Sequence, residues 1–229
     1  MFNDIRISGD MMERFKERIG CAGSKAVLHG VEMNVQVLTT GFWPTQVAAS
    51  CTLPPEIVHC CDTFKKFYLG EHSGRKLTWQ TNMGTVDLKA NYSNRTRELT
   101  VSTYQMSILM MFNSTDVITF KELQERTGIP TSDLTRNLLS LSCGKYRVLL
   151  KDSKGKEIAA QDRFAYNSKF KSKLVKVRIT PVAASEAQGA TLRKKIDEDR
   201  NHQYPLYALS QPCPHFLAIA SAGADIAHC

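Results

Sequence analysis

Cysteine and histidine have the widest chemical range of any residues in this chain, and neither type falls into a pattern that supports metal binding. The chain has seven cysteines among its 229 residues, at positions 21, 51, 60, 61, 143, 213 and 229. No two of them form the Cys-x-x-Cys pair that is typical of zinc ribbons and RING domains. Their odd number and irregular spacing also argue against a disulfide framework. We therefore expect no metal site, and we expect Cys60 and Cys61 to be structural thiols on the buried face of a helix.

The motifs of the common catalytic sites are also missing. The six histidines are scattered along the chain. There is no Gly-x-Ser-x-Gly nucleophile motif, no glycine-rich phosphate loop with a lysine, and no His-Glu-x-x-His zinc motif. We therefore predict a protein that is not an enzyme and needs no cofactor.

Positive charge is concentrated in one segment. The chain carries 30 Lys and Arg against 22 Asp and Glu, a net charge of +8. Segment 145–178 alone holds eleven basic and three acidic residues, so the remainder of the chain is neutral overall. Such a segment attracts an acidic partner: nucleic acid, a membrane surface or an acidic protein face. The alternative is a basic face that contacts only solvent.

Neither end of the sequence nor its interior suggests a membrane protein. No run of about 18 apolar residues is present, so we expect no membrane span. The first residues, Met1 to Arg6, have no apolar stretch of the kind that signal peptides carry. We therefore expect an intracellular protein.

The first half of the chain alternates between helical and strand periodicity. Ser8 can accept a hydrogen bond as the N-cap of a helix that carries Met12, Phe15 and Ile19 on one side. A Pro-Pro pair at 54–55 suits the start of a second helix. This half therefore predicts, in chain order, helix 8–19, strand 31–37, helix 54–72, a hairpin of 77–80 and 86–92 with its turn at 82–84, and a third strand at 99–101.

In the second half the period changes to about 3.6 residues. A first helix follows Ser102, and Thr119 with Glu122 forms a capping box for a second helix that ends at Gly128. A third helix begins at Thr131, and strands are expected near 148–150, 164–166 and 175–179. Three short helices followed by a basic hairpin is the order of a winged helix, which suggests DNA binding.

The composition of the third helix weakens the DNA hypothesis. Between Thr131 and Cys143 the only cation is Arg136, which Asp133 offsets, and Asn137 is the only side-chain amide. A helix that reads bases normally presents several such groups. The basic hairpin then supports nonspecific phosphate contacts at best. A winged-helix nucleic-acid-binding protein is kept as the alternative function.

Several long motifs, in order, resemble the cullin homology region. They are Val35–Thr45, His72–Trp79, Val101–Met106 and Leu138–Lys145, with weaker likeness at Met1–Ile5 and Ile196–Arg200. The resemblance covers about residues 1–203. Residues 80–84 are similar to the cullin-three branch and residues 154–157 to the cullin-four branch; we favour the first.

The resemblance implies an α+β fold, in which an α/β sheet domain precedes a winged-helix-like unit of three helices and a β-hairpin. The expected organisation is a remnant of a helical bundle with a loop (1–30), the sheet region (31–101), the winged-helix-like region (102–180), a linker with the start of an acidic helix (181–203) and a divergent tail (204–229).

The resemblance also implies a function, that of a scaffold in a cullin-RING ubiquitin ligase in the cytoplasm and nucleus. In this family the sheet captures a strand of a RING-box protein, through which a ubiquitin-conjugating enzyme is recruited. An alternating strand at a sheet edge suits such capture. The residues expected to line the site are Val35, Val37, Leu38, Trp43, Leu77 and Trp79.

The chain also departs from the family pattern. The helical stalk that holds a substrate adaptor is missing, so an adaptor is expected only in a full-length form. The likeness stops near Gln203, before the winged helix whose lysine is modified in cullins, so no modification site is carried over. With most of the bundle missing, we expect Met12, Phe15 and Ile19 and an open sheet edge to be exposed and to promote aggregation.

Overall fold

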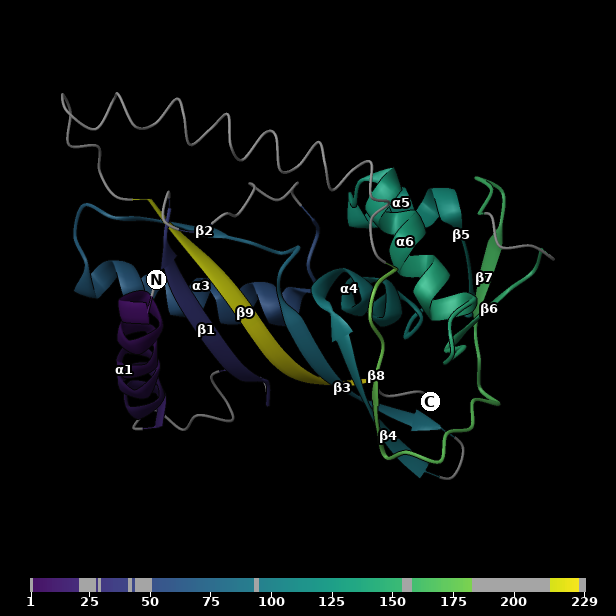
Figure 1. Cartoon of the computed structure of the whole chain (residues 1–229), viewed down its shortest axis with the longest axis horizontal. Coiled ribbons are helices and arrows are strands. Elements are labelled where there is room, and N and C mark those ends of the chain that lie inside the picture. Colours follow the sequence, from purple (N-terminus) through teal and green to yellow (C-terminus); the bar gives the residue numbers. More distant parts are fainter. Residues whose placement is uncertain are drawn as a thin grey trace.

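The computed structural model describes residues 2–20, 28, 30–40, 43, 51–92, 95–153, 158–182 and 215–226. These residues form two sheets with helices packed beside them (Figure 1). The elements are α1 (Phe2–Gly20), β1 (Glu32–Thr39), α3 (Pro55–Glu71), β2 (Lys76–Trp79), β3 (Thr85–Tyr92), β4 (Arg95–Ser102), α4 (Thr103–Met111), β5 (Val117–Thr119), α5 (Phe120–Thr127), α6 (Thr131–Ser142), β6 (Leu149–Lys151), β7 (Arg163–Tyr166), β8 (Lys176–Arg178) and β9 (His215–Ile226). This mixture of helices and strands confirms the predicted α+β class.

The larger sheet has the strand order β1-β9-β3-β4-β8, and β2 also pairs with β9. β3 and β4 form an antiparallel hairpin, and β8 extends the sheet by pairing parallel with β4. β9, the last strand in the chain, lies between β1 and β3 (Figure 1). It runs antiparallel to β1 and parallel to both β2 and β3. The centre of the sheet is therefore made by a segment remote in sequence from its neighbours.

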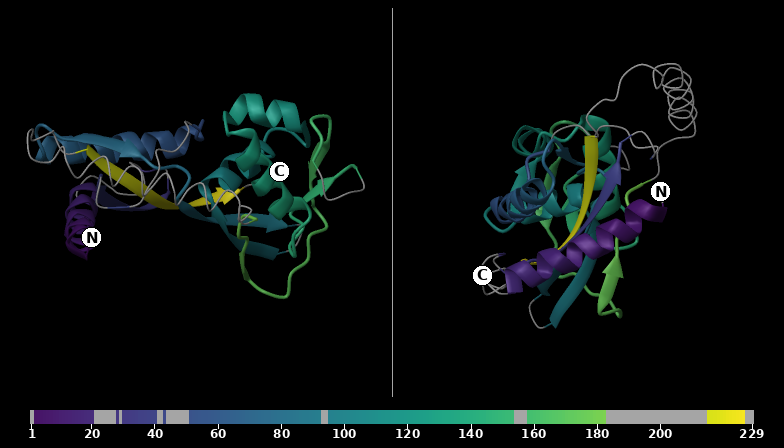
Figure 2. Two further views of the ribbon diagram at one scale, coloured as in Figure 1. Left: turned by 45° about the horizontal axis from the view of Figure 1, so that its top comes forward. Right: turned by 90° about the vertical axis from the view of Figure 1, so that its left-hand side faces the viewer.

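α3 lies across one face of the larger sheet, as both views in Figure 2 show. Its predicted apolar face is confirmed as buried: Ile57, Cys60, Cys61, Phe64, Phe67 and Tyr68. Phe64 stands at the centre of an aromatic cluster, with ring centroids 5.1 Å from Phe15 of α1 and 6.0 Å from Trp79 of β2. α1, α3 and the sheet thus share one apolar core.

In the second half of the chain, α5 and α6 pack against a three-stranded sheet of order β5-β7-β6, and α4 packs against both helices and against β3 and β4. The predicted capping box of Thr119 and Glu122 is confirmed before α5. α4 and α6 begin after Ser102 and at Thr131 as predicted, and Ser102 forms with Gln105 a further capping box that the sequence did not predict. Gly128 ends α5 in the left-handed conformation with φ 65°, which glycine adopts without steric cost. Three helices precede the β6–β7 pair in the expected order, and the assignment of this unit to the winged-helix class stays a prediction.

The first helix differs from its predicted form. α1 begins at Phe2, so Ser8 lies inside the helix and is buried instead of capping it. Met12, Phe15 and Ile19 are 5%, 1% and 7% exposed. The expectation that this face is exposed is therefore wrong. The reason is that α1 packs against α3, which supplies the apolar contacts that we had assigned to missing helices.

The predicted hairpin of 77–80 and 86–92 is also wrong. β2 pairs with residues 215–218 of β9, and β3 pairs with residues 221–226 of the same strand. Because β2 and β3 follow one another along the same edge of β9, they lie end to end and not side by side. The alternation in each strand is correct, but the turn at 82–84 continues the edge instead of reversing it.

The buried position of Phe15 gives a test of the α1–α3 contact. Phe15→Ala removes a ring that contacts both Phe64 and Phe67, and we expect it to lower the free energy of unfolding by about 3–5 kcal/mol. Ile7→Ala, at a position of the same helix that is 41% exposed, is the matched control and should change it by less than about 0.5 kcal/mol. Urea denaturation followed by circular dichroism measures both, and equal effects would contradict the packing of α1.

Candidate functional site

The candidate site is the position in the larger sheet that has β1 on one side and β2 and β3 on the other, which we call the central strand position. β1 alternates as predicted: Met33, Val35 and Val37 are buried, whereas Glu32 and Asn34 are exposed. Eight consecutive residues of β1 pair with β9, from Glu32 opposite Gly223 to Thr39 opposite Phe216. β9 is the only strand partner of β1 among the described residues. The inner edge of β1 is thus a continuous row of backbone donors and acceptors.

The opposite side of the central strand position is formed by β2 and β3. Four residues of β2 pair with residues 215–218, and six residues of β3 pair with residues 221–226. Ala218 lies between Val37 and Trp79, and Leu217 between Leu38 and Thr78. A strand here is therefore held by backbone pairing along both of its edges.

Five of the six predicted site residues surround this position. Val35, Val37 and Leu38 lie on β1, and Leu77 and Trp79 lie on β2. All are buried except Trp79, which is partly buried and packs edge-on against Phe64. Their role in binding a partner stays a prediction.

The sixth predicted residue, Trp43, is placed differently. Its indole Nε1–H donates to Oδ2 of Asp4 at 3.0 Å. The same carboxylate oxygen accepts the backbone N–H of Thr39 at 3.1 Å. Partial burial raises the pKa of Asp4, but these hydrogen bonds outweigh that effect and the pKa is lowered overall. The Asp4 carboxylate at the start of α1 therefore binds both Trp43 and the end of β1.

The outer edge of β1 is covered by side chains of α1. The Ser8 hydroxyl accepts the N–H of Val37 at 2.9 Å. Ser8 Oγ also lies 2.9 Å from the carbonyl oxygen of Val37 and 2.7 Å from that of Asp4, so its single proton can be donated to either. Together with the Asp4–Thr39 bond, this gives the outward-facing N–H groups of Val37 and Thr39 acceptors on α1. At this end of β1, the side chains of α1 thus occupy the outer edge, and β9 pairs with the inner edge.

The adjacent free cysteines of α3, Cys60 and Cys61, are poor nucleophiles. Burial, followed by the neighbouring Cys60 and Asp62, raises the pKa of Cys61 to about 12. Burial also raises the pKa of Cys60. Both thiols are therefore protonated near neutral pH, and the neutral thiol is a poor nucleophile. Their place among the aromatic rings of α3 is that of packing residues, as predicted.

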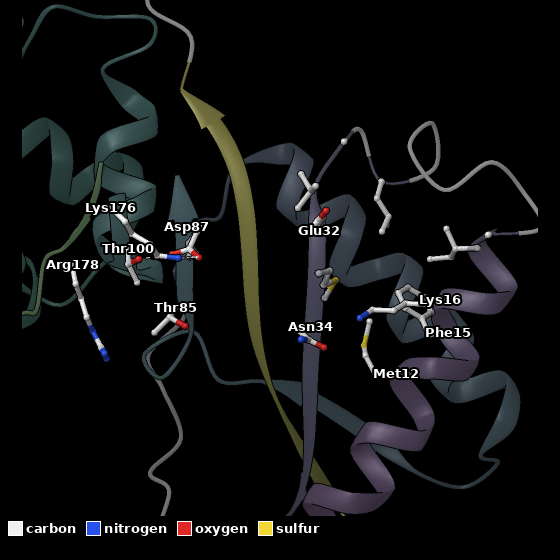
Figure 3. Close-up of a pocket in the computed structure, with 17 residues that line it drawn as sticks. Met12, Phe15, Lys16, Glu32, Asn34, Thr85, Asp87, Thr100, Lys176 and Arg178 are labelled. Carbon is white, nitrogen blue, oxygen red and sulfur yellow. Dashed lines mark hydrogen bonds and ion pairs between the residues drawn. The ribbon is translucent and has the colours of Figure 1, made fainter. Parts of the chain in front are cut away.

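A groove of about 1060 Å³ lies between α1 and β8, with lining residues from α1, β1, β3, β4 and β8. Figure 3 shows β9 running between its two walls, with Lys16, Glu32 and Asn34 on one side and Asp87 and Lys176 on the other. The two walls are thus the two sides of the central strand position.

Two charged groups of the second wall, Lys176 and Asp87, are paired with each other. Lys176 Nζ lies 2.8 Å from Oδ2 of Asp87. Hydrogen bonds from Lys176 and Thr100 lower the pKa of Asp87. Both members of the ion pair are about half exposed, so it contributes little to stability.

Within the residues that the structure describes, no group of three or more His, Cys, Asp or Glu side chains could hold a metal ion. In the same part of the chain, no helix combines the length and apolar character needed to cross a bilayer.

Sequence reasoning missed β9. The segment 215–226 was treated as part of a divergent tail, although alanine occurs at 218, 220, 222 and 224. That period of two was the available signal. The composition of residues 204–229, with one charged side chain, six alanines and three prolines, predicts instead a tail that diverges from the family.

Comparison with known proteins gives one family. Residues 37–170 match the model described as the cullin alpha+beta domain. The chain is 43% identical over 239 residues to Cullin-3 of Dictyostelium discoideum, covering 89% of this chain and 31% of that protein. It is 44% identical over 209 residues to Cullin-3A of Arabidopsis thaliana, covering 89% of this chain and 28% of that protein. It is 40% identical over 205 residues to Cullin-4A of Mus musculus, covering 89% of this chain and 27% of that protein. The chain therefore spans less than a third of the length of these relatives.

The hydrogen bonds between Ser8 and β1 can be tested by removing the Ser8 hydroxyl. Ser8→Ala leaves the N–H and C=O of Val37 without their side-chain partner in a buried place, and we expect a loss of about 1–3 kcal/mol in the free energy of unfolding. Ser114→Ala, at an exposed position, is the control and should cost less than about 0.5 kcal/mol. Chemical denaturation of both variants gives the comparison, and a neutral Ser8→Ala would mean that the outer edge of β1 is satisfied in another way.

The lowered pKa of Asp4 predicts that the stability of the fold decreases on acidification. Because its pKa in the folded chain is lowered, the ionised carboxylate stabilises the fold above the ordinary value of 3.8, and this contribution is lost as the pH falls through the lowered value. Asp4→Asn keeps an acceptor but does not titrate, so the stability difference between wild type and variant should shrink on acidification. Thermal melts between about pH 6 and pH 2 measure it. Asp10→Asn on the same helix is the control; a constant difference for Asp4→Asn would refute the prediction.

Proposed function

Because the chain belongs to the cullin family, we propose that it is a scaffold fragment of a cullin-RING ubiquitin ligase, which binds a RING-box protein at the central strand position and has no catalytic role. The observation that carries this proposal is the inner edge of β1, whose single strand partner among the described residues comes from a remote segment. The ubiquitin-ligase scaffold function of the family is proposed here for the region that this chain represents.

The geometry supports recognition by strand addition. In this mode the backbone of an extended segment supplies the hydrogen bonds, and side chains at alternate positions supply specificity. β1 offers a partner eight consecutive residues, and its buried Met33, Val35 and Val37 alternate along that length. β2 and β3 offer a second edge to the same segment. A strand bound here gains pairing on both sides, unlike one that adds to the outside of a sheet.

In a scaffold role, the chain holds its partners together, and the partners carry out ubiquitin transfer. A RING-box protein bound at the sheet would recruit the ubiquitin-conjugating enzyme, and a substrate adaptor would join only a longer form of the chain. The basic segment 145–178 is a candidate contact for an acidic face within that assembly. We propose the cytoplasm and nucleus as the location.

The nucleic-acid alternative is less well supported. Arg136, the only cation of α6, donates from Nε to the carbonyl oxygen of Val182 at 2.9 Å and from Nη1 to Asp133 at 3.1 Å. Asn137, its only amide, is 4% exposed and donates to the carbonyl oxygen of Asp133. The groups of α6 that would read base edges are therefore engaged within the protein.

Co-expression with a RING-box protein tests the proposed function. We expect a one-to-one complex that survives affinity purification and size exclusion in high salt, because strand pairing does not depend on counterion release as phosphate binding does. Val35→Asp, which places a charge at a buried position of β1, should abolish the complex. Gln36→Asp, at the neighbouring exposed position, should retain it.

Circular dichroism of each variant separates loss of binding from loss of folding. A folded wild-type chain that forms no complex would overturn the proposal. Steeply salt-dependent binding to DNA under the same conditions would favour the alternative.

A further inference from the structure

We propose that β9 occupies, within the same chain, the strand position that the RING-box protein binds, so that the C-terminal segment competes directly with the partner. This inference rests on the proposed function and adds to it the regulation of the site and the kind of strand that the site accepts.

The larger sheet depends on β9 for its continuity. β1 and β2 each have β9 as their only strand partner among the described residues, whereas β3 also pairs with β4. Without β9 the described strands of this sheet separate into β1, β2 and the β3-β4-β8 group. The space between β1 and β3 is two strand spacings, about 9.6 Å, which accommodates one strand. The site is therefore incomplete until some extended segment fills it.

Occupation of this position is mutually exclusive. β9 pairs with eight residues of β1, four of β2 and six of β3. Each backbone N–H has one proton to donate, so β1 cannot pair with β9 and with an incoming strand along the same residues. A partner must displace β9, or it must bind a molecule in which β9 has already dissociated from the central strand position. The apparent affinity then falls in proportion to the fraction of molecules with the position open.

β9 also indicates what kind of strand fits. It runs antiparallel to β1 and parallel to β3. The residues that pair with the buried Met33, Val35 and Val37 are the alanines at positions 222, 220 and 218. A partner strand should therefore keep this direction, extend for about eight residues as β1 does, and carry small residues at these alternate positions.

Proline substitution offers a way to release β9. The N–H and C=O of Val37 face Ser8, so hydrogen bonding to β9 falls at the alternate residues of β1, Asn34 opposite Ser221 among them. Ser221→Pro removes the N–H that pairs with Asn34 and so weakens β9. Ser210→Pro makes the same exchange outside β9 and is the matched control.

A disulfide offers the opposite perturbation. Because Val37 turns its backbone groups toward Ser8, Val37 and Ala218 form a non-hydrogen-bonded pair, with an expected Cα separation of about 4.5 Å that suits a disulfide. The double variant Val37→Cys/Ala218→Cys should cross-link under oxidising conditions and hold β9 in place. Peptide mapping by mass spectrometry identifies the new disulfide against the seven native cysteines.

The experiment measures the affinity of the full chain and its variants for a purified, fluorescently labelled RING-box protein. We expect Ser221→Pro to raise the affinity at least tenfold over wild type and over Ser210→Pro. The oxidised double variant should lose binding, and a reductant should restore it. If Ser221→Pro unfolds the chain, the affinities of the oxidised and reduced forms of the double variant still test the proposal.

The other outcomes separate the two proposals. Equal affinity of wild type, Ser221→Pro and the oxidised double variant would overturn the competition but leave RING-box binding intact. Failure of the two introduced thiols to cross-link would show that β9 does not occupy the position. A folded chain that binds no RING-box protein in any of these forms would overturn the proposed function, and the competition with it.

Discussion

The backbone of β1 needs hydrogen-bond partners along both edges, and the remainder of the larger sheet is arranged around that requirement. On the outer edge, Ser8 and Asp4 of α1 supply the partners for Val37 and Thr39. On the inner edge, β9 supplies them over the whole strand. Because unpaired backbone groups are costly when buried, α1 and β9 are the two elements on which this end of the protein depends.

The two edges of β1 are satisfied by different kinds of partner, and this difference has functional meaning. Side chains on a helix bind at isolated points and cannot be exchanged without unpacking Phe15 from α3. A strand binds through a regular backbone pattern that another extended segment can reproduce. The inner edge is therefore suited to exchange, whereas the outer edge is suited to permanent attachment.

An apolar layer beneath the sheet joins its helices and strands and encloses two adjacent cysteines. Phe64 joins α1, α3 and β2 through its contacts with Phe15 and Trp79. Cys60 and Cys61, whose thiols could otherwise act as nucleophiles, lie in this layer, and their pKa values are raised. On the second wall of the groove, Lys176 pairs with Asp87. The inner edge of β1 therefore pairs through its backbone groups above an apolar layer.

The sequence alone determined the elements whose causes lie within a few residues. The capping box at Thr119, the buried face of α3 and the alternation of β1 all follow from local hydrogen bonding and periodicity, and each was predicted correctly. The family resemblance also placed Val35 and Trp79 near one site. Which strands pair was decided only by the tertiary structure. Ser8 was predicted to cap a helix but serves β1, and β2 was assigned to β3 but pairs with β9. Every strand edge carries the same backbone groups, so the local sequence cannot distinguish a neighbouring strand from one that arrives from residue 215 onward.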